Sequence, residues 1–222
     1  MIERNGKDNQ GILTGFVAHY LKNALAEISA EACRLRDNET LLLAVHRLSR
    51  IISDTLYLEQ LQGHILPPPP AEEIAGSELL ELLRIRLQPE IDARNASLSL
   101  SMEPDVSLIT NLDFSLEAFE RLALVTLNWI VPDRPLKVTA SKPPCRITVG
   151  PFLARPQAPL WPDPAYLDTL SEQDRLSFLV ARELLAFLGC RLETEPGDSA
   201  GQRCWLISFT GEFNSQRRRT DG

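Results

Sequence analysis

Residues 13–32, LTGFVAHYLKNALAEISAEA, form the segment from which the interpretation of this chain starts. Its apolar residues recur every three or four positions, which is the spacing of one face of an α-helix. These residues are Leu13, Val17, Leu21, Leu25, Ile28 and Ala32. No proline occurs from residue 9 to residue 63, and the polar cluster at residues 37–39 predicts a turn between two helices. This part of the chain therefore predicts a helical hairpin.

The second predicted helix carries a matching apolar stripe. Its main positions are Leu41, Val45, Leu48 and Ile52, and it is widened by Ala44, Ile51 and Leu58. Two amphipathic helices alone would leave much of this apolar surface in water. Two hairpins packed together as a four-helix bundle would bury it. We therefore expect a homodimer.

The four prolines at residues 67–70 predict a stiff, extended spacer. Beyond it, helical and alternating patterns are interleaved. Helices are predicted at 77–94, with Ser77 as N-cap, at 116–131, and at 176–188, with Gly189 as C-terminal cap. Strands are predicted at 97–102, 136–140, 146–149, 191–194 and 204–209. Helices interleaved with antiparallel strands favour an α/β sandwich with its helices on one sheet face.

The predicted fold class is thus α+β, with a helical hairpin followed by an α/β sandwich. The predicted divisions are a hairpin at 1–66, a proline-rich linker at 67–76, an α/β domain at 77–212 and a polar tail at 213–222.

Composition excludes several classes of function. The net charge is −7, and the one dense basic run is Arg217–Arg219, so attraction to nucleic acid is not expected. No apolar run approaches the length of a membrane-spanning helix, so no membrane partner is expected. The four cysteines are far apart and form neither a metal motif nor a disulfide framework. We expect a reduced, cytoplasmic protein without a bound metal.

The solvent face of the first predicted helix carries a polar set around His19. Its helical phase places His19 about 160° around the helix from the nearest apolar positions on either side. The same face carries Gly15, Lys22 and Asn23. Imidazole is a nucleophile near neutral pH, Lys22 can offset phosphoryl charge, and Asn23 can hydrogen-bond the group. On spacing alone, however, an exposed histidine most often has no function.

The segment FVAHYLKNALAEI, residues 16–28, resembles the phosphoacceptor box of histidine kinases. Three positions match the pattern of that family: His19, Asn23 and Leu25. The resemblance implies that His19 carries phosphate and that Asn23 serves reactions with a receiver domain. The family's acidic residue after the histidine, implied to help attack on ATP, is replaced by Tyr20. Self-phosphorylation is therefore not expected.

The second half resembles the kinase ATP-binding domain in the order of its elements. The helix at 116–131 stands where the family has an asparagine pair for a magnesium-bound triphosphate, but it contains only Asn128. After the strand RITVG, the family has an aspartate and closely spaced glycines, whereas this chain continues GPFLARPQAPLW. Between residues 132 and 188 the only glycine is Gly150, so no nucleotide site and no cofactor are expected.

Together these features resemble the ChpT-type bacterial histidine phosphotransferases. The resemblance implies that His19 shuttles a phosphoryl group between the aspartates of response-regulator receiver domains. Receivers would dock on the face around Gly15, Phe16, His19, Lys22 and Asn23, and any Mg²⁺ would come with the receiver. Two alternatives remain open: a non-catalytic protein that binds a receiver or kinase, and a receiver phosphatase that uses Asn23 to position water.

Overall fold

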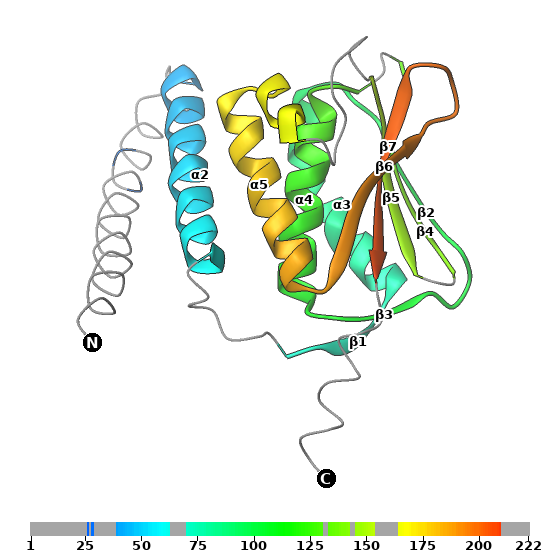
Figure 1. Cartoon of the computed structure of the whole chain (residues 1–222). Helices are drawn as coiled ribbons and strands as arrows, with labels where there is room; N and C mark the ends of the chain where they lie inside the picture. The colour runs from blue at the N-terminus through cyan, green and yellow to red at the C-terminus, as the bar shows by residue number, and fades with distance from the viewer. Residues whose placement is uncertain are drawn as a thin grey trace, which may run out of the picture. The chain divides into compact units, whose positions relative to one another are not determined.

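The computed structural model describes the chain as two compact units that divide between Pro67 and Pro68 (Figure 1). The residues that the structure describes are Ala26, Ile28, 39–62, 70–130, 133–142, 145–153 and 164–209.

In the first unit the structure describes one long helix, α2 (Glu39–Gln62). Its sequence contains neither glycine nor proline, and leucine and isoleucine recur at helical spacing. Of the preceding predicted helix, only Ala26 and Ile28 are described, and both are helical. The hairpin and its assembly into a dimeric bundle therefore remain predictions.

The second unit combines one sheet of five strands with three α-helices. The helices are α3 (Gly76–Ala93), α4 (Leu112–Leu127) and α5 (Glu172–Phe187), with a short 3-10 helix, η1 (Pro164–Thr169), before α5. The sheet strands are β2 (Leu98–Met102), β4 (Leu136–Ser141), β5 (Arg146–Leu153), β6 (Cys190–Pro196) and β7 (Gln202–Phe209). Figure 1 shows the three helices together on one face of this sheet, as predicted for the α/β sandwich.

The sheet has the order β2-β4-β5-β7-β6. All neighbouring strands are antiparallel except β2 and β4, which are parallel. On β4, the alternate residues Leu136, Val138 and Ala140 are buried, as the predicted alternation requires. The helix α4 is buried on most sides because it packs against α3, α5 and the sheet.

An aromatic cluster centred on Trp205 fills the interior between the sheet, η1 and α5. The indole of Trp205 stacks on Phe152 with ring centroids 4.8 Å apart. Its centroid lies 5.2 Å from Phe178 and 5.6 Å from Tyr166. The indole Nε1 donates to Thr126 Oγ1 at 2.9 Å, so the polar atom of this buried ring is satisfied by α4.

The predicted start of the first helix in this unit is wrong in detail. α3 begins at Gly76, and its N-cap is Ala75, which makes no side-chain capping bond; Ser77 is not the cap. Close packing explains this start. The Gly76 N–H donates to the Val106 carbonyl at 2.8 Å, and a Cβ at Gly76 would meet Met102 Sδ at 2.6 Å.

The other two helices differ from prediction mainly at their starts. α4 begins four residues earlier than predicted, because Asn111 accepts a hydrogen bond from the Phe114 N–H and caps it. It also ends earlier, at Leu127, so Asn128 is its C-cap. α5 begins at Glu172 because Ser171 caps it. At its other end Gly189 has φ 71°, the left-handed conformation expected of a C-terminal cap.

Two short strands were not predicted. They are β1 (Glu72–Ala75) and β3 (Ser107–Thr110), which pair antiparallel as a separate two-stranded sheet. The residues of β1 lie in the segment predicted as linker at 67–76, so the end of that segment contributes to the fold of the second unit. In addition, no helix within the described ranges is long and apolar enough to cross a membrane.

We expect Thr126→Val to lower the free energy of unfolding of the second unit by about 1–3 kcal/mol, because the buried Trp205 N–H would lose its acceptor. Denaturant unfolding followed by tryptophan fluorescence measures the change. Thr148→Val is the matched control, since Thr148 loses only a 3.3 Å contact with the half-buried Glu195. Equal stability of Thr126→Val and wild type would show that the bond contributes nothing.

Candidate functional site

The five predicted site residues lie outside the described residues. They are Gly15, Phe16, His19, Lys22 and Asn23. Their geometry therefore stays a prediction from the sequence. What the structure does describe is the helix α2 of the same unit and the region of the second unit where the sequence lacks nucleotide-binding residues.

Two residues of the predicted apolar stripe on α2 are exposed in the single chain. Leu48 is 47% exposed and Ile51 is 38% exposed, and they are one helical turn apart. Ile28 of the preceding segment is 46% exposed. By contrast, Val45, Asp54 and Leu61 of α2 are buried. The exposed positions belong to the stripe from which the sequence predicts a two-chain bundle.

Asn128 is the single asparagine of the segment 116–131. Both the oxygen and the nitrogen of its side-chain amide form hydrogen bonds. Its Oδ1 accepts from Arg94 Nη1 at 2.5 Å, and its Nδ2 donates to Asp174 Oδ1 at 2.5 Å. These partners come from the end of α3 and the first turn of α5. Asn128 thus connects three helices, and its amide is already occupied by charged side chains.

Both partners of the Asn128 amide, Asp174 and Arg94, form further polar interactions. Asp174 Oδ2 accepts from Ser171 Oγ at 2.8 Å, while the Asp174 N–H donates back to Ser171 Oγ at 3.1 Å. Arg94 forms an ion pair with Glu90 at 3.4 Å. Burial, and secondarily the negative charge of Asp174, raise the pKa of Tyr166. The cluster therefore joins protein groups to one another.

The strand β5 continues through the segment where the sequence lacks the family's aspartate and glycines. It extends over Gly150 and Pro151 to Leu153. Phe152 is 4% exposed, and its ring is the one stacked on Trp205. A Cβ at Gly150 would meet Cys204 Sγ at 2.7 Å, so this glycine serves strand packing. Apolar side chains fill the space beside β5.

The described cysteines are partly buried. Burial, and secondarily Cys145, raise the pKa of Cys190 to about 12. Burial, with smaller contributions from Glu195 and Asp198, raises the pKa of Cys204 to about 11. Burial also raises the pKa of Cys145. These thiols are protonated near neutral pH and are poor nucleophiles. Within the described ranges, no group of histidine, cysteine and acidic side chains could hold a metal ion.

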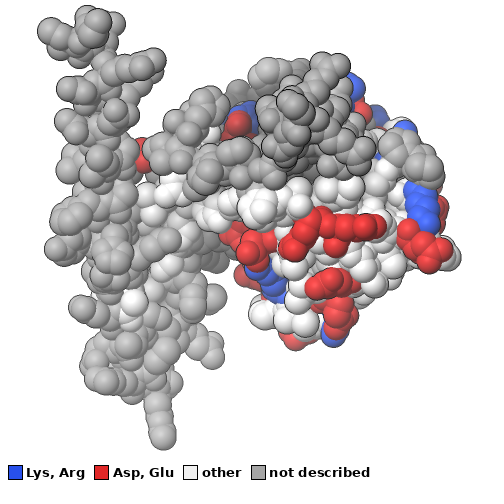
Figure 2. Space-filling model, turned by 90° about the horizontal axis from the view of Figure 1, so that it is seen from below, with Lys and Arg blue, Asp and Glu red and all other residues white. Residues whose placement is uncertain are grey.

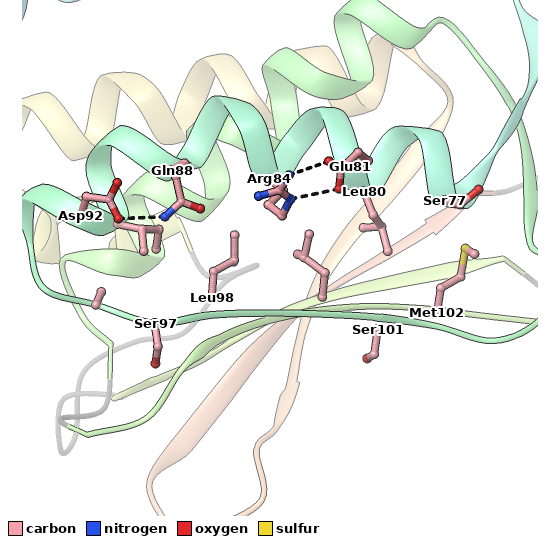
Figure 3. Close-up of a pocket in the computed structure, with 13 residues that line it drawn as sticks. Ser77, Leu80, Glu81, Arg84, Gln88, Asp92, Ser97, Leu98, Ser101 and Met102 are labelled. Atoms are coloured by element: carbon pink, nitrogen blue, oxygen red, sulfur yellow. Dashed lines mark hydrogen bonds and ion pairs between the residues drawn. The ribbon is translucent and has the colours of Figure 1, made fainter.

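A groove of about 560 Å³ lies between α3 and the edge strand β2 (Figure 3). Its floor is apolar, from Leu80, Leu98, Leu100 and Met102, and its rim is polar, from Ser77, Glu81, Arg84, Gln88 and Asp92. Two pairs close part of the rim: Arg84 with Glu81 at 2.6 Å, and Gln88 with Asp92 at 2.8 Å. No local sequence pattern reveals which strand lies at a sheet edge, so this groove could not be predicted from the sequence.

The surface of the second unit agrees with the negative charge of the chain. On the face shown in Figure 2, acidic side chains cover a larger area than basic ones. Several of the basic side chains are paired: Arg86 contacts Glu117 at 3.1 Å and Glu120 at 3.3 Å. On this face, therefore, the described basic side chains form no extended area.

Comparison with known proteins finds similarity in structure and none in sequence. No family model and no curated protein matches the sequence. The catalytic domain of the histidine kinase ThkA matches 63% of this chain and 94% of its own, with 12% identity and a TM-score of 0.51.

Two longer histidine kinases match more of the chain. Full-length ShkA, solved in complex with AMPPNP, matches 88% of this chain over 45% of its own, with 13% identity and a TM-score of 0.65. The Acinetobacter baumannii histidine kinase AdeS matches 85% of this chain and 97% of its own, with 12% identity and a TM-score of 0.59. Since the second unit begins only at Pro68, both matches extend into the first unit. The chain therefore has a histidine-kinase-like fold, with a second unit that resembles the catalytic domains of these kinases.

Proposed function

We propose that this chain is a histidine phosphotransferase of a two-component phosphorelay, with His19 as the residue that carries the phosphoryl group. The observation that carries the proposal is the likeness to histidine kinases over both units, which favours two-component signalling. The sequence around His19 supplies the second argument, because three of its positions match the phosphoacceptor box.

In the proposed reaction, an imidazole nitrogen of His19 attacks the phosphorus of an aspartyl phosphate on a receiver domain. A P–N bond forms, the P–O bond to the aspartate breaks, and the carboxylate leaves. The same exchange in reverse delivers the group to a second receiver. Lys22 offsets the negative charge of the transferring phosphoryl group, and Asn23 forms a hydrogen bond with it. Mg²⁺ comes with the acidic pocket of the receiver, which docks around Gly15 and Phe16.

The described residues of the second unit support a phosphoryl source other than ATP. Both amide atoms of Asn128 are held by Arg94 and Asp174, so this side chain would have to give up two charge-assisted bonds to bind a metal–nucleotide complex. Phe152 lies in the segment where the family has an aspartate and closely spaced glycines, and its ring stacks on Trp205. A receiver's acyl phosphate needs neither ATP nor these residues.

A homodimer is part of the proposal. Leu48, Ile51 and Ile28 are large apolar side chains that remain exposed in the single chain. Packing against a second hairpin would remove these side chains from water. Each Å² of apolar surface buried in this way stabilises the dimer by roughly 25 cal/mol. The two alternatives, a non-catalytic binder and a receiver phosphatase, use the same face and differ in what becomes of the phosphate.

The first test is phosphotransfer from a phosphorylated receiver to the full chain. We expect wild type to acquire an acid-labile, base-stable label and His19→Ala to acquire none, because the P–N bond forms on the imidazole. His64→Ala is the matched control and should be labelled like wild type. Unchanged labelling of His19→Ala would reject the assignment. Normal pathway function of that variant would favour the non-catalytic binder.

The second test uses Asn23→Ala and follows the phosphate to its destination. We expect the rate of transfer to His19 to fall about 10- to 100-fold, since one hydrogen bond to the transferring group is lost. Asn38→Ala, in the predicted turn, is the control and should transfer at the wild-type rate. A phosphatase would give a different result. Wild type would release inorganic phosphate from the receiver, and Asn23→Ala would not, although its His19 would still be labelled.

The third test concerns assembly. We expect the double variant Leu48→Glu/Ile51→Glu to be monomeric at concentrations where wild type is a dimer, because four charges would enter each apolar interface. Sedimentation equilibrium measures the change in mass. Ile85→Glu/Ile109→Glu is the matched control, since these residues are 56% and 50% exposed but lie on the second unit. A dimer that survives the α2 substitutions contradicts the proposed bundle.

A further inference from the structure

The strand β2 is an edge strand of the main sheet. It is the first strand in the sheet order, and no described residue pairs with its outer side. The Ser97 carbonyl accepts from the Leu136 N–H, and the Glu103 N–H donates to the Ala140 carbonyl, so both groups point towards β4. Because peptide groups alternate along a strand, those of the even-numbered residues of β2 point outwards. These residues are Leu98, Leu100 and Met102.

The same three residues supply apolar side chains to the groove between α3 and β2. Figure 3 shows Leu98 and Met102 pointing towards α3, whereas Ser97 and Ser101 point away from it. All three apolar side chains of β2 remain partly exposed. An extended chain beside β2 would therefore meet outward backbone donors and acceptors and, on one side, an apolar floor. That combination is what binding of a peptide by strand addition requires.

The two edges of this sheet differ in how they are protected. The opposite edge strand, β6, carries Arg191, Glu193 and Glu195 and ends in Pro196. Charges and proline are the common means of preventing an edge from pairing with another chain. The sequence of β2, LSLSM, contains neither. β2 therefore lacks the features that would prevent another chain from pairing with it.

The rim of the groove is acidic at one end. Arg84 donates to both carboxylate oxygens of Glu81, at 2.9 and 2.6 Å, so these two charges offset each other. Asp92 accepts its hydrogen bond from the neutral amide of Gln88 at 2.8 Å, which leaves the charge of its carboxylate in place. Figure 3 shows Asp92 above the Ser97 end of β2. The net charge of the rim residues is therefore negative, and it lies at this end.

We propose that β2 and this groove bind an extended segment of a partner protein, paired antiparallel with β2. The segment has aliphatic residues at alternate positions, which face the apolar floor, and a lysine or arginine at its C-terminal end. Because β2 runs from Leu98 to Met102, the C-terminal end of an antiparallel segment lies beside Asp92. An ammonium or guanidinium group there forms a charge-assisted hydrogen bond with the Asp92 carboxylate.

A second copy of this chain fits the groove less well than such a segment. Two β2 strands paired antiparallel about Leu100 would bring the start of the second copy's α3 towards Asp92. α3 starts beside Met102, since a Cβ at Gly76 would meet Met102 Sδ at 2.6 Å, and its first turn carries the acidic Glu78. Like charges would then meet, and Asp92 would gain no cation.

Residue-resolved amide exchange by NMR on the full chain tests the proposal, with the synthetic peptide acetyl-TSVSVSK-amide as the probe. At saturation the peptide should slow exchange of the Leu98, Leu100 and Met102 amides at least about tenfold. The amides of Ser99 and Ser101 should not change, since they point towards β4. N-methylation of both valine amides of the peptide should abolish the effect, because these amides face β2. N-methylation of its first and last serine amides should not, because these face away.

A charge swap at Asp92 tests the choice of a basic segment. Asp92 is exposed, so Asp92→Lys should fold like wild type. Wild type should bind acetyl-TSVSVSE-amide about three- to tenfold more weakly than the lysine peptide, because repulsion replaces attraction at one surface pair. In Asp92→Lys this order of affinities should reverse. Asp198→Lys makes the same change of charge between β6 and β7 and is the control, which should keep the wild-type order.

Three results would overturn the proposal. The outward amides of β2 could already exchange slowly without peptide, which would mean that this chain or a second copy covers the edge. The peptide with methylated valines could protect them equally well, which would mean that no strand pairing occurs. Alternatively, Asp92→Lys could leave the order of the two peptides unchanged, which would mean that the charge of the rim selects nothing. None of these outcomes depends on labelling of His19.

Discussion

The second unit depends on the position of one indole ring. Trp205 lies on a central strand of the sheet, is 1% exposed, and contacts aromatic rings from β5, η1 and α5. Its single polar atom is buried and needs an acceptor, and Thr126 of α4 provides one at 2.9 Å. Thr126 in turn donates to the Leu122 carbonyl within its own helix. This bond therefore links α4 of the helical layer directly to the sheet.

Much of this fold follows from local patterns. Alternating apolar and polar residues predict the strand 97–102, and the SKPP turn predicts the strand pair 136–140 and 146–149; the structure has strands at all three places. The helix boundaries were less accurate, since a cap such as Asn111 or Ser171 works through its own geometry rather than through the apolar period. β1 and β3 were missed because each has four residues and is stabilised mainly by the other, across about thirty residues of intervening chain.

The sequence predicts part of the candidate site, and the rest depends on contacts that form only in the folded chain. The prediction of His19 rests on a short contiguous pattern, which a sequence alone can supply. The sequence also indicated that Asn128 stands without a second asparagine. It could not indicate that the amide is held by Arg94 and Asp174, because these partners are 34 and 46 residues away along the chain. Such pairings depend on how three helix ends meet, and only the folded chain specifies that.

The described interior limits what the second unit can bind. Aromatic rings fill the space around Trp205 beside β5, whereas the polar groups that pair at Asn128 are at least partly exposed to solvent. A ligand that took the place of the Phe152 ring would remove the stacking partner of the buried Trp205, which costs several kcal/mol before any new contact forms. The groove of about 560 Å³ between α3 and β2 requires no such displacement. A ligand of the second unit would therefore meet less resistance at this groove than beside Trp205.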